Sequence, residues 1–135
     1  MTSADLERLR DFGRRYTAAW SSQDPAAVAA FFASDGSLRV NDAEPAVGRE
    51  AITAVARGFM TDLPDLKVVM DDLVVEGDTV IFRWTLTGTN TGPGGTRRAV
   101  KTSGFEEWRM SAGGLVAESL GHLDADDYRR QLDGR

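Results

Sequence analysis

The stretch TVIFRWTLTGT, residues 79–89, alternates apolar and polar side chains and predicts a β-strand with one buried face. Successive side chains of a strand point to opposite faces of the sheet. One face of this strand therefore carries Val80, Phe82, Trp84 and Leu86. The other carries Arg83, Thr85 and Thr87, so we expect an apolar inner face and a polar outer face.

Three more segments around this strand are predicted to be strands, at residues 66–75, 96–110 and 115–123. Short turn-rich connections separate the four segments, which is typical of antiparallel neighbours. In the strand at 96–110, alternation places Val100, Glu106, Trp108 and Met110 on one face. In the strand at 115–123, it places Val116, Glu118, Leu120 and His122 together.

The first part of the chain has the periodicity of helices. The first helix has an apolar stripe at spacings of three and four residues, formed by Leu6, Leu9, Phe12, Tyr16 and Trp20. A second helix is expected to begin at Asp24-Pro25, to bury Val28, Phe31 and Phe32, and to end at Gly36.

A short strand at residues 37–41 and a third helix complete this part of the chain. The third helix follows Gly48, buries Ile52, Val55 and Phe59, and ends before Pro64. A last helix is capped by Asp124. Helices followed by long strands indicate an α+β fold, a curved antiparallel sheet with three N-terminal helices packed on its concave face. Residues 1–135 are predicted to form a single domain.

Composition excludes several classes of function. The 135 residues contain 16 Lys and Arg against 21 Asp and Glu, a net charge of −5, which argues against a nucleic-acid partner. Without cysteine and with His122 as the one histidine, no cysteine-based or multi-histidine metal site is expected. The start of the chain has no apolar signal sequence, and the longest apolar run, residues 26–33, is too short for a bilayer. We therefore expect a cytoplasmic protein without a membrane partner.

Several short phrases along the chain resemble the SnoaL-like branch of the nuclear transport factor 2-like superfamily. They are YTAAW at 16–20, FFASDG at 31–36, VGREAI at 47–52, EGDTV at 76–80, GTNTG at 88–92 and GGLVAE at 113–118, with residues 124–132 at the end. The resemblance implies a cone-shaped sheet around a helix-covered pocket, no cofactor, and a homodimer formed through the outer sheet face. Relatives with this fold are isomerases, cyclases, epoxide hydrolases and plain binding subunits, so fold alone does not define the activity.

The resemblance to ketosteroid isomerases singles out Tyr16 and Glu106. These enzymes stabilise an oxyanion with a tyrosine and a protonated acid, and use a separate aspartate as the base. Tyr16 falls at the tyrosine position and Glu106 about where the protonated acid belongs. The base would fall at Val40, which cannot accept a proton, and Asp42 is about 7 Å further along the strand. The alternative is that Tyr16 packs in the core with its hydroxyl satisfied.

The resemblance to SnoaL-like cyclases points to the last strand. Their acidic residue falls at Gly121 here, and His122 is the neighbouring side chain that could replace it as acid and base. Adjacent residues of a strand face opposite sides unless a bulge intervenes. The histidine of the family's Gly-Thr-His phrase is replaced by Asn90. An epoxide hydrolase is the least favoured activity, because Arg83 faces away from the pocket and Asp72 lacks an evident partner.

Together these patterns predict a pocket for a small hydrophobic or polycyclic ketone, with proton-transfer chemistry such as isomerisation or cyclisation. The candidate catalytic residues are Tyr16, Glu106, His122 and Asp124. The candidate ligand-binding residues are Trp20, Phe32, Phe59, Trp84, Asn90, Trp108 and Glu118. The alternative is a non-catalytic ligand-binding or dimerisation module in which the same positions line a cavity.

Overall fold

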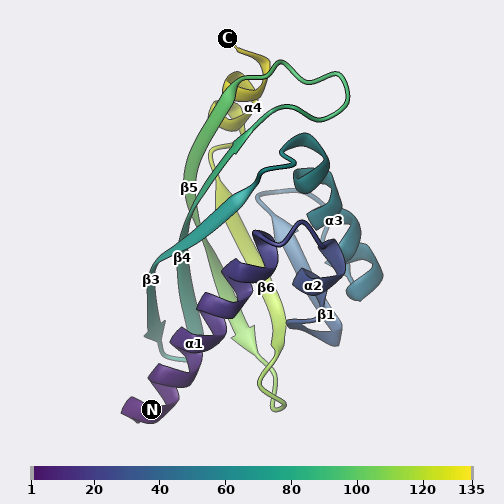
Figure 1. The fold of residues 1–135 in the computed structure, drawn as a ribbon. Helices are drawn as coiled ribbons and strands as arrows, with labels where there is room; N and C mark the ends of the chain where they lie inside the picture. The colour runs from purple at the N-terminus through teal and green to yellow at the C-terminus, as the bar shows by residue number, and fades with distance from the viewer. Residues whose placement is uncertain (1, 135) are drawn as a thin grey trace.

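The computed structural model describes residues 2–134, in which helices cover one face of a strongly curved sheet (Figure 1). The helices are α1 (Ser3–Trp20), α2 (Pro25–Ala29), α3 (Arg49–Asp62) and α4 (Ala125–Asp133). The strands are β1 (Phe32–Val40), β2 (Ala46–Val47), β3 (Lys67–Glu76), β4 (Thr79–Thr89), β5 (Ala99–Met110) and β6 (Val116–Leu123). The α+β class predicted from the sequence is confirmed.

The six strands form one sheet in the order β2-β1-β6-β5-β4-β3. The four long strands β3 to β6 are antiparallel neighbours, as the turn-rich connections predicted. β1 is longer than expected and runs parallel to β6, which the sequence pattern did not indicate. The sheet therefore extends past β6 to a fifth long strand, and β2 pairs with its far edge.

The second helix is shorter than predicted. Asp24 caps it by accepting a hydrogen bond from the Ala26 backbone N–H at 3.1 Å, but the helix ends at Ala29. Phe32 does not extend the helix; it begins β1 and pairs with Val116 of β6. Gly36 is not a helix stop but part of an irregular stretch of β1, where an added Cβ would lie 2.8 Å from the Val116 carbonyl oxygen. Pairing with β6 therefore overrides the local preference of these residues for helix.

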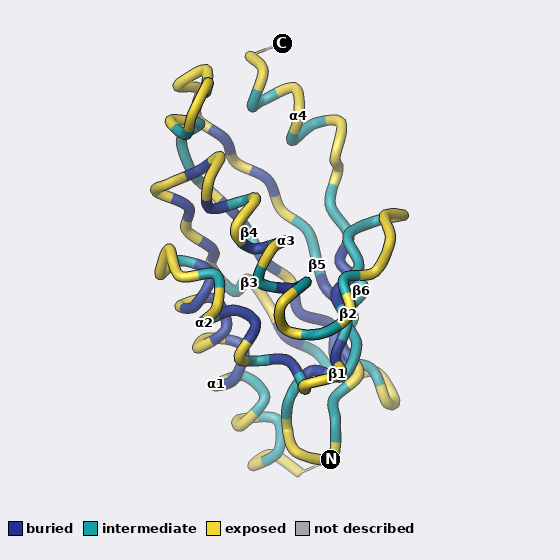
Figure 2. The backbone as a smooth tube through the Cα atoms, turned by 90° about the vertical axis from the view of Figure 1, so that its right-hand side faces the viewer, coloured by how far each residue is buried: buried dark blue, intermediate teal, exposed yellow. Residues whose placement is uncertain are grey.

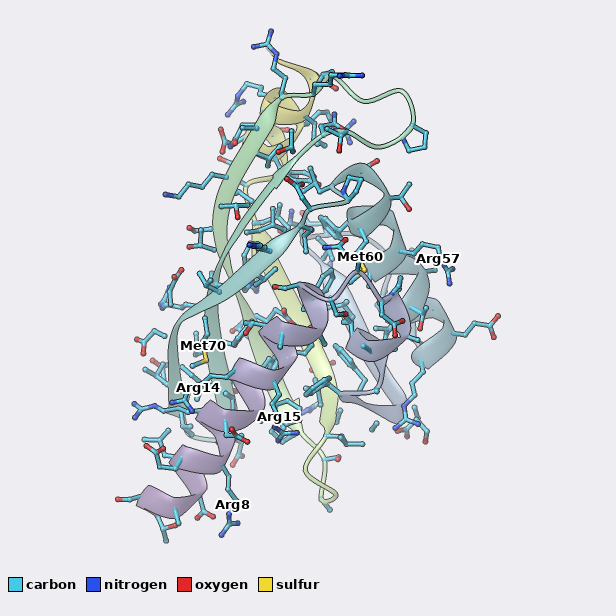
Figure 3. The ribbon with its side chains drawn as sticks, viewed as in Figure 1. Arg8, Arg14, Arg15, Arg57, Met60 and Met70 are labelled. Carbon is cyan, nitrogen blue, oxygen red and sulfur yellow. The ribbon has the colours of Figure 1, made fainter. Side chains whose placement is uncertain are left out.

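α1 and α3 lie on the concave side of the sheet with the apolar faces predicted for them. In α1, Gly13 permits a close approach to β3, since a Cβ there would lie 2.7 Å from the Met70 sulfur. In α3, Met60 lies on the inner side and Arg57 projects outward (Figure 3). Figure 2 shows the buried residues along the strands and these covering helices, while α4 contains no fully buried residue.

A bulge in β6 changes which side chains face the core. Arg109 of β5 pairs with Glu118, but the next residue, Met110, pairs with Val116, so Ala117 has no partner on β5. The phase of alternation shifts at this point. The prediction that Glu118, Leu120 and His122 share a face with Val116 is therefore wrong. After the bulge, the inward residues are Ser119, Gly121 and Leu123.

Among residues 2–134, no helix combines the length and the apolar character needed to cross a membrane.

Candidate functional site

A cavity of about 50 Å³ lies between the concave face of the sheet and the helices that cover it. Its wall is largely apolar and includes Trp20, Leu38, Val40, Phe59, Phe82 and Leu86. The polar side chains of the wall come from Trp84, Thr102, Glu106 and Tyr128, and His122 also borders the cavity. A volume of this size holds a few water molecules or a small ligand.

Glu106 is the acidic side chain of this wall, and only 7% of the residue is exposed. Its Oε1 accepts three hydrogen bonds: 3.1 Å from the Tyr16 hydroxyl, 3.0 Å from the Trp108 indole N–H, and 2.6 Å from the Ser119 hydroxyl. No group among residues 2–134 donates to its other oxygen, Oε2. The carboxyl group is thus fixed through Oε1, and Oε2 is left for the cavity.

This environment has opposing effects on the acidity of Glu106. Burial raises the pKa of its carboxyl group above the ordinary 4.5, because the charged form loses its hydration. The hydrogen bonds from Ser119, Trp108 and Tyr16 favour the charged form and lower the pKa, but the effect of burial is larger. Oε1 is occupied by three donors, so the proton of the acid form resides on Oε2.

Tyr16 lies behind Glu106 and does not line the cavity. The residue is fully buried, and its ring packs against Phe82 and Trp108 at centroid distances of 5.5 and 5.3 Å. Burial and the nearby Glu106 carboxyl raise the Tyr16 pKa well above 10, so its hydroxyl stays protonated and donates. In this geometry Tyr16 contacts Glu106 and leaves the ligand space to other side chains.

The partners of Glu106 are themselves held by close packing. Trp108 is fully buried and stacks on Phe82, with ring centroids 4.7 Å apart and an interplanar angle of 15°. Phe12 packs edge-on against Trp108 at 5.6 Å. Ser119 is fully buried at an inward position of β6. The donors are therefore preorganised by the core, and Glu106 has little freedom to turn away from the cavity.

The imidazole of His122 lies on the outer face of the sheet. It stacks on Phe105 at 4.5 Å, and its Nε2 lies 2.7 Å from Glu107 Oε2. Phe105 also contacts Arg83, whose guanidinium carbon lies 5.5 Å from the Phe105 ring centroid. The bulge in β6 places His122 among these outward residues, although its strand position borders the cavity.

The remaining candidate residues are spread over the fold. Trp20, Phe59 and Trp84 line the cavity, whereas Phe32 is fully buried at the start of β1. Asn90 donates to the Leu132 carbonyl oxygen at 3.0 Å and so links the β4–β5 loop to α4.

Two acids predicted near the pocket have structural partners outside it. Glu118 pairs with Arg109 at 3.1 Å on the outer face, and both side chains are partly exposed. Asp124 caps α4 by accepting a hydrogen bond from the Asp127 N–H at 3.0 Å. The structure therefore brings Tyr16, Glu106 and Trp108 together, and leaves Glu118 and Asp124 apart from them.

Sequence reasoning did not identify Ser119 and Tyr128. The bulge at Ala117 makes Ser119 face inward, and this position cannot be predicted from regular alternation in the sequence. Tyr128 had a visible signal, since it and Leu132 form an apolar i,i+4 pair on an otherwise polar helix. Within residues 2–134, no group of three or more acidic or histidine side chains is placed to hold a metal ion.

The curved sheet, the covering helices and the cavity between them define the nuclear transport factor 2-like class of proteins. The SnoaL-like domain family matches residues 13–119, and the chain belongs to this family. No curated protein sequence matches the chain.

Solved structures support the same class. A protein named as a SnoaL-like polyketide cyclase from Jannaschia sp. CCS1 is 19% identical over 90% of this chain and 88% of its own, with a TM-score of 0.76. A protein with a ketosteroid isomerase-like fold from Catenulispora acidiphila, in complex with trimethylamine, is 18% identical over 88% of this chain and 89% of its own, with a TM-score of 0.76. TsrD from Streptomyces laurentii is 25% identical over 100% of this chain and 99% of its own, with a TM-score of 0.78.

Proposed function

We propose that this protein binds a small, mostly apolar ketone and moves a proton of that ligand with Glu106. The observation that supports this proposal is the asymmetry of the buried carboxyl group. Oε1 accepts hydrogen bonds from Tyr16, Trp108 and Ser119, while Oε2 has no donor among residues 2–134 and Glu106 lines the largely apolar cavity. A carboxylate in apolar surroundings is a stronger base than one in water.

The proposed step is proton removal from the carbon next to the ketone carbonyl. The C–H bond breaks, an O–H bond forms on Oε2 of Glu106, and the electron pair moves onto the carbonyl oxygen to give an enolate. The protonated Glu106 then returns the proton to the same carbon or to another position, which amounts to exchange or isomerisation. Tyr16, Trp108 and Ser119 act as positioning residues because they contact Glu106 and not the ligand.

The resemblance to SnoaL-like cyclases fits this assignment. It places their acidic residue at Gly121, and Gly121 pairs directly with Glu106 across β6 and β5. Residues paired across an antiparallel ladder lie about 5 Å apart at their Cα atoms. Glu106 therefore supplies a carboxyl group from the neighbouring strand to the same part of the cavity. His122 and Asp124 take no part in this proton path, because their side chains have partners elsewhere.

The size of the cavity favours a small ligand over a polycyclic one. A volume of about 50 Å³ leaves room for few heavy atoms beyond the side chains that line it. A ligand of several rings would have to extend out of the cavity or move an element that lines it, such as α4. α4 is the helix without a fully buried residue, so we expect any such opening to occur there.

The alternative function is a non-catalytic binding module. Its cavity would take an apolar molecule, or a small amine paired with Glu106, without chemical change. The similar protein from Catenulispora acidiphila was solved in complex with trimethylamine, so this amine is a suitable probe.

We further propose a homodimer formed through the outer face of the sheet. Arg83, Phe105 and His122 stack there as a layer in which Arg83 is exposed and the other two are partly buried, and the Arg109–Glu118 ion pair lies on the same face. Aromatic and arginine side chains are enriched at protein interfaces.

A thermal-shift screen tests the proposed function. The probes are cyclohexanone, acetophenone, 2-tetralone and trimethylamine, each at concentrations up to a few millimolar. Binding at a hundredfold excess over Kd stabilises the protein by about 2.7 kcal/mol. Ketones that bind are then incubated with the protein in deuterated water. Catalysed exchange of the hydrogens next to the carbonyl supports the enzyme, and binding without exchange supports the binding module. If no ketone shifts the melting temperature, the proposal is wrong.

A further inference from the structure

Two hydrogen-bond donors at the cavity have no partner among residues 2–134. They are the indole Nε1 of Trp84 and the hydroxyl of Tyr128, and both atoms are buried. Both residues line the same cavity as Glu106. Trp84 is only 8% exposed, so bulk water has little access to its indole. Buried polar groups without a partner are uncommon in folded proteins and point to a missing ligand or water molecule.

The indole of Trp84 is held in one place by the sheet beneath it. A Cβ added at Gly104 would lie 2.6 Å from Cζ2 and 2.9 Å from Cη2 of Trp84, so the ring lies directly over this glycine. Gly104 pairs with Leu123, which also lines the cavity and immediately precedes Asp124, the cap of α4. Trp84 therefore belongs to the end of the cavity nearest α4.

Tyr128 reaches this cavity from α4 itself. Its ring packs against Phe59 of α3 at a centroid distance of 5.7 Å. Burial and the nearby Asp62 carboxylate raise the pKa of Tyr128 to about 12, so the hydroxyl remains a donor near neutral pH. Trp84 has an N–H that only donates. The two side chains thus offer two donors and require an acceptor.

Glu106 lies at a different level of the same cavity. It pairs with Phe82, which is two residues before Trp84 in β4. Two residues along a strand correspond to about 7 Å. Trp84 and Tyr128 thus supply unpartnered donors to a largely apolar cavity, and Glu106 supplies a carboxyl group about one strand repeat away from Trp84.

We propose that Trp84 Nε1 and the Tyr128 hydroxyl bind the carbonyl oxygen of the ligand. This inference rests on the proposed function, because it assigns the orientation of the ketone in the same cavity. The carbonyl oxygen accepts from both donors, and the carbon chain of the ketone reaches Glu106. When Glu106 Oε2 takes the proton, negative charge develops on the carbonyl oxygen. Trp84 and Tyr128 then stabilise this oxyanion, the role that the resemblance to ketosteroid isomerases had suggested for Tyr16 and Glu106.

The test compares ketones with alkenes of the same shape but without an acceptor oxygen. The pairs are cyclohexanone with methylenecyclohexane, and acetophenone with α-methylstyrene. Kd values are measured by NMR titration of the wild type, Trp84→Phe and Tyr128→Phe. The indole resonance of Trp84 is identified by its loss in Trp84→Phe, and Tyr128→Phe removes one oxygen while keeping the ring, so at least one variant stays folded.

A ketone is expected to shift the Trp84 indole proton downfield, and its matched alkene to leave the proton near its free position. Each variant should weaken ketone binding about fivefold, the effect of one neutral hydrogen bond, and should change alkene binding by less than about twofold. Equal losses for ketone and alkene overturn the inference, since both side chains then act only by packing. The inference is also overturned if no ketone shifts the indole proton resonance of Trp84.

The proposed function can fail separately. If both variants weaken ketone binding selectively but Glu106→Gln leaves hydrogen exchange unchanged, the carbonyl site stands and the proton transfer by Glu106 is wrong.

Discussion

The hydroxyl of Tyr16 in α1 donates a 3.1 Å hydrogen bond to Oε1 of Glu106 in β5, 90 positions away in sequence. The bond connects the first helix to the centre of the sheet. Oε1 also accepts hydrogen bonds from Trp108 and Ser119, whereas Oε2 has no donor among residues 2–134. In the proposed reaction, the ligand therefore exchanges its proton with Oε2.

Tyr16→Phe removes this hydrogen bond and keeps the ring that packs against Phe82 and Trp108. The Tyr16 hydrogen bond lowers the pKa of Glu106, so its loss should move that pKa further upward. The titration of Glu106, followed by ¹³C NMR of labelled glutamate, should shift to higher pH. The variant should also be less stable by about 1 to 3 kcal/mol in urea denaturation. An unchanged or lower titration midpoint contradicts the account.

Glu106→Gln should change how stability depends on pH. The pKa of Glu106 is raised in the folded protein, so its contribution to stability is present in full below the unfolded value near 4.5 and is lost as pH rises through the folded pKa. Glutamine does not titrate, so the variant should gain stability relative to the wild type between pH 5 and pH 8. Urea denaturation at both pH values measures this difference.

Glu107→Gln is the matched control, because Glu107 lies next in sequence but pairs with His122 on the outer face. A constant difference between Glu106→Gln and the wild type over this pH range would mean that Glu106 is not perturbed by burial.

Much of the fold follows from periodicity. The inner face of β4 and the apolar stripe of α1 were predicted correctly, because each pattern extends over several turns or pleats. Glu106 was also placed on the inner face correctly, since it is in phase with Trp108. In these long elements, the spacing of the apolar residues in the sequence identifies the buried face directly.

Other features depend on tertiary contacts that the sequence does not display. Phe32 has the neighbours of a helix residue, yet pairing with Val116 places it in a strand. Because Ala117 has no partner on β5, Glu118 and His122 lie on the outer face of the sheet instead of the predicted inner face. The network around Glu106 could be predicted only for Trp108, two residues away on the same strand face. Ser119 required knowledge of the bulge.

Changes at the cavity wall should alter the preferred size of the ligand. Val40 and Gly121 are paired neighbours that both line the cavity. Val40→Ala removes two methyl groups and should improve binding of 2-tetralone relative to cyclohexanone, at a cost of about 1 kcal/mol in stability. Gly121→Ala should do the opposite, because its methyl group would lie 3.8 Å from Glu106 Cγ. Kd ratios for the two ketones measure the effect, and equal ratios in both variants contradict the position of the binding site.

The outer face should mediate dimerisation. Light scattering at tens of micromolar protein should give the mass of a dimer. Arg83→Glu reverses a charge next to Phe105 and should shift the equilibrium toward monomer. Arg57→Glu is the control, because Arg57 projects from α3 away from this face (Figure 3). A wild type that is monomeric, or equal dimerisation of the two variants, contradicts this interface.

The role of Glu106 as the proton carrier is tested by the rate of hydrogen–deuterium exchange next to the carbonyl of a ketone that binds. The rate is measured by NMR at saturating ketone for the wild type, Glu106→Gln and Glu107→Gln. Glu106→Gln should lower the protein-catalysed rate at least about 100-fold while still binding the ketone. Glu107→Gln should keep the wild-type rate. Equal rates for Glu106→Gln and the wild type, with the ketone bound in both, would show that Glu106 does not carry the proton.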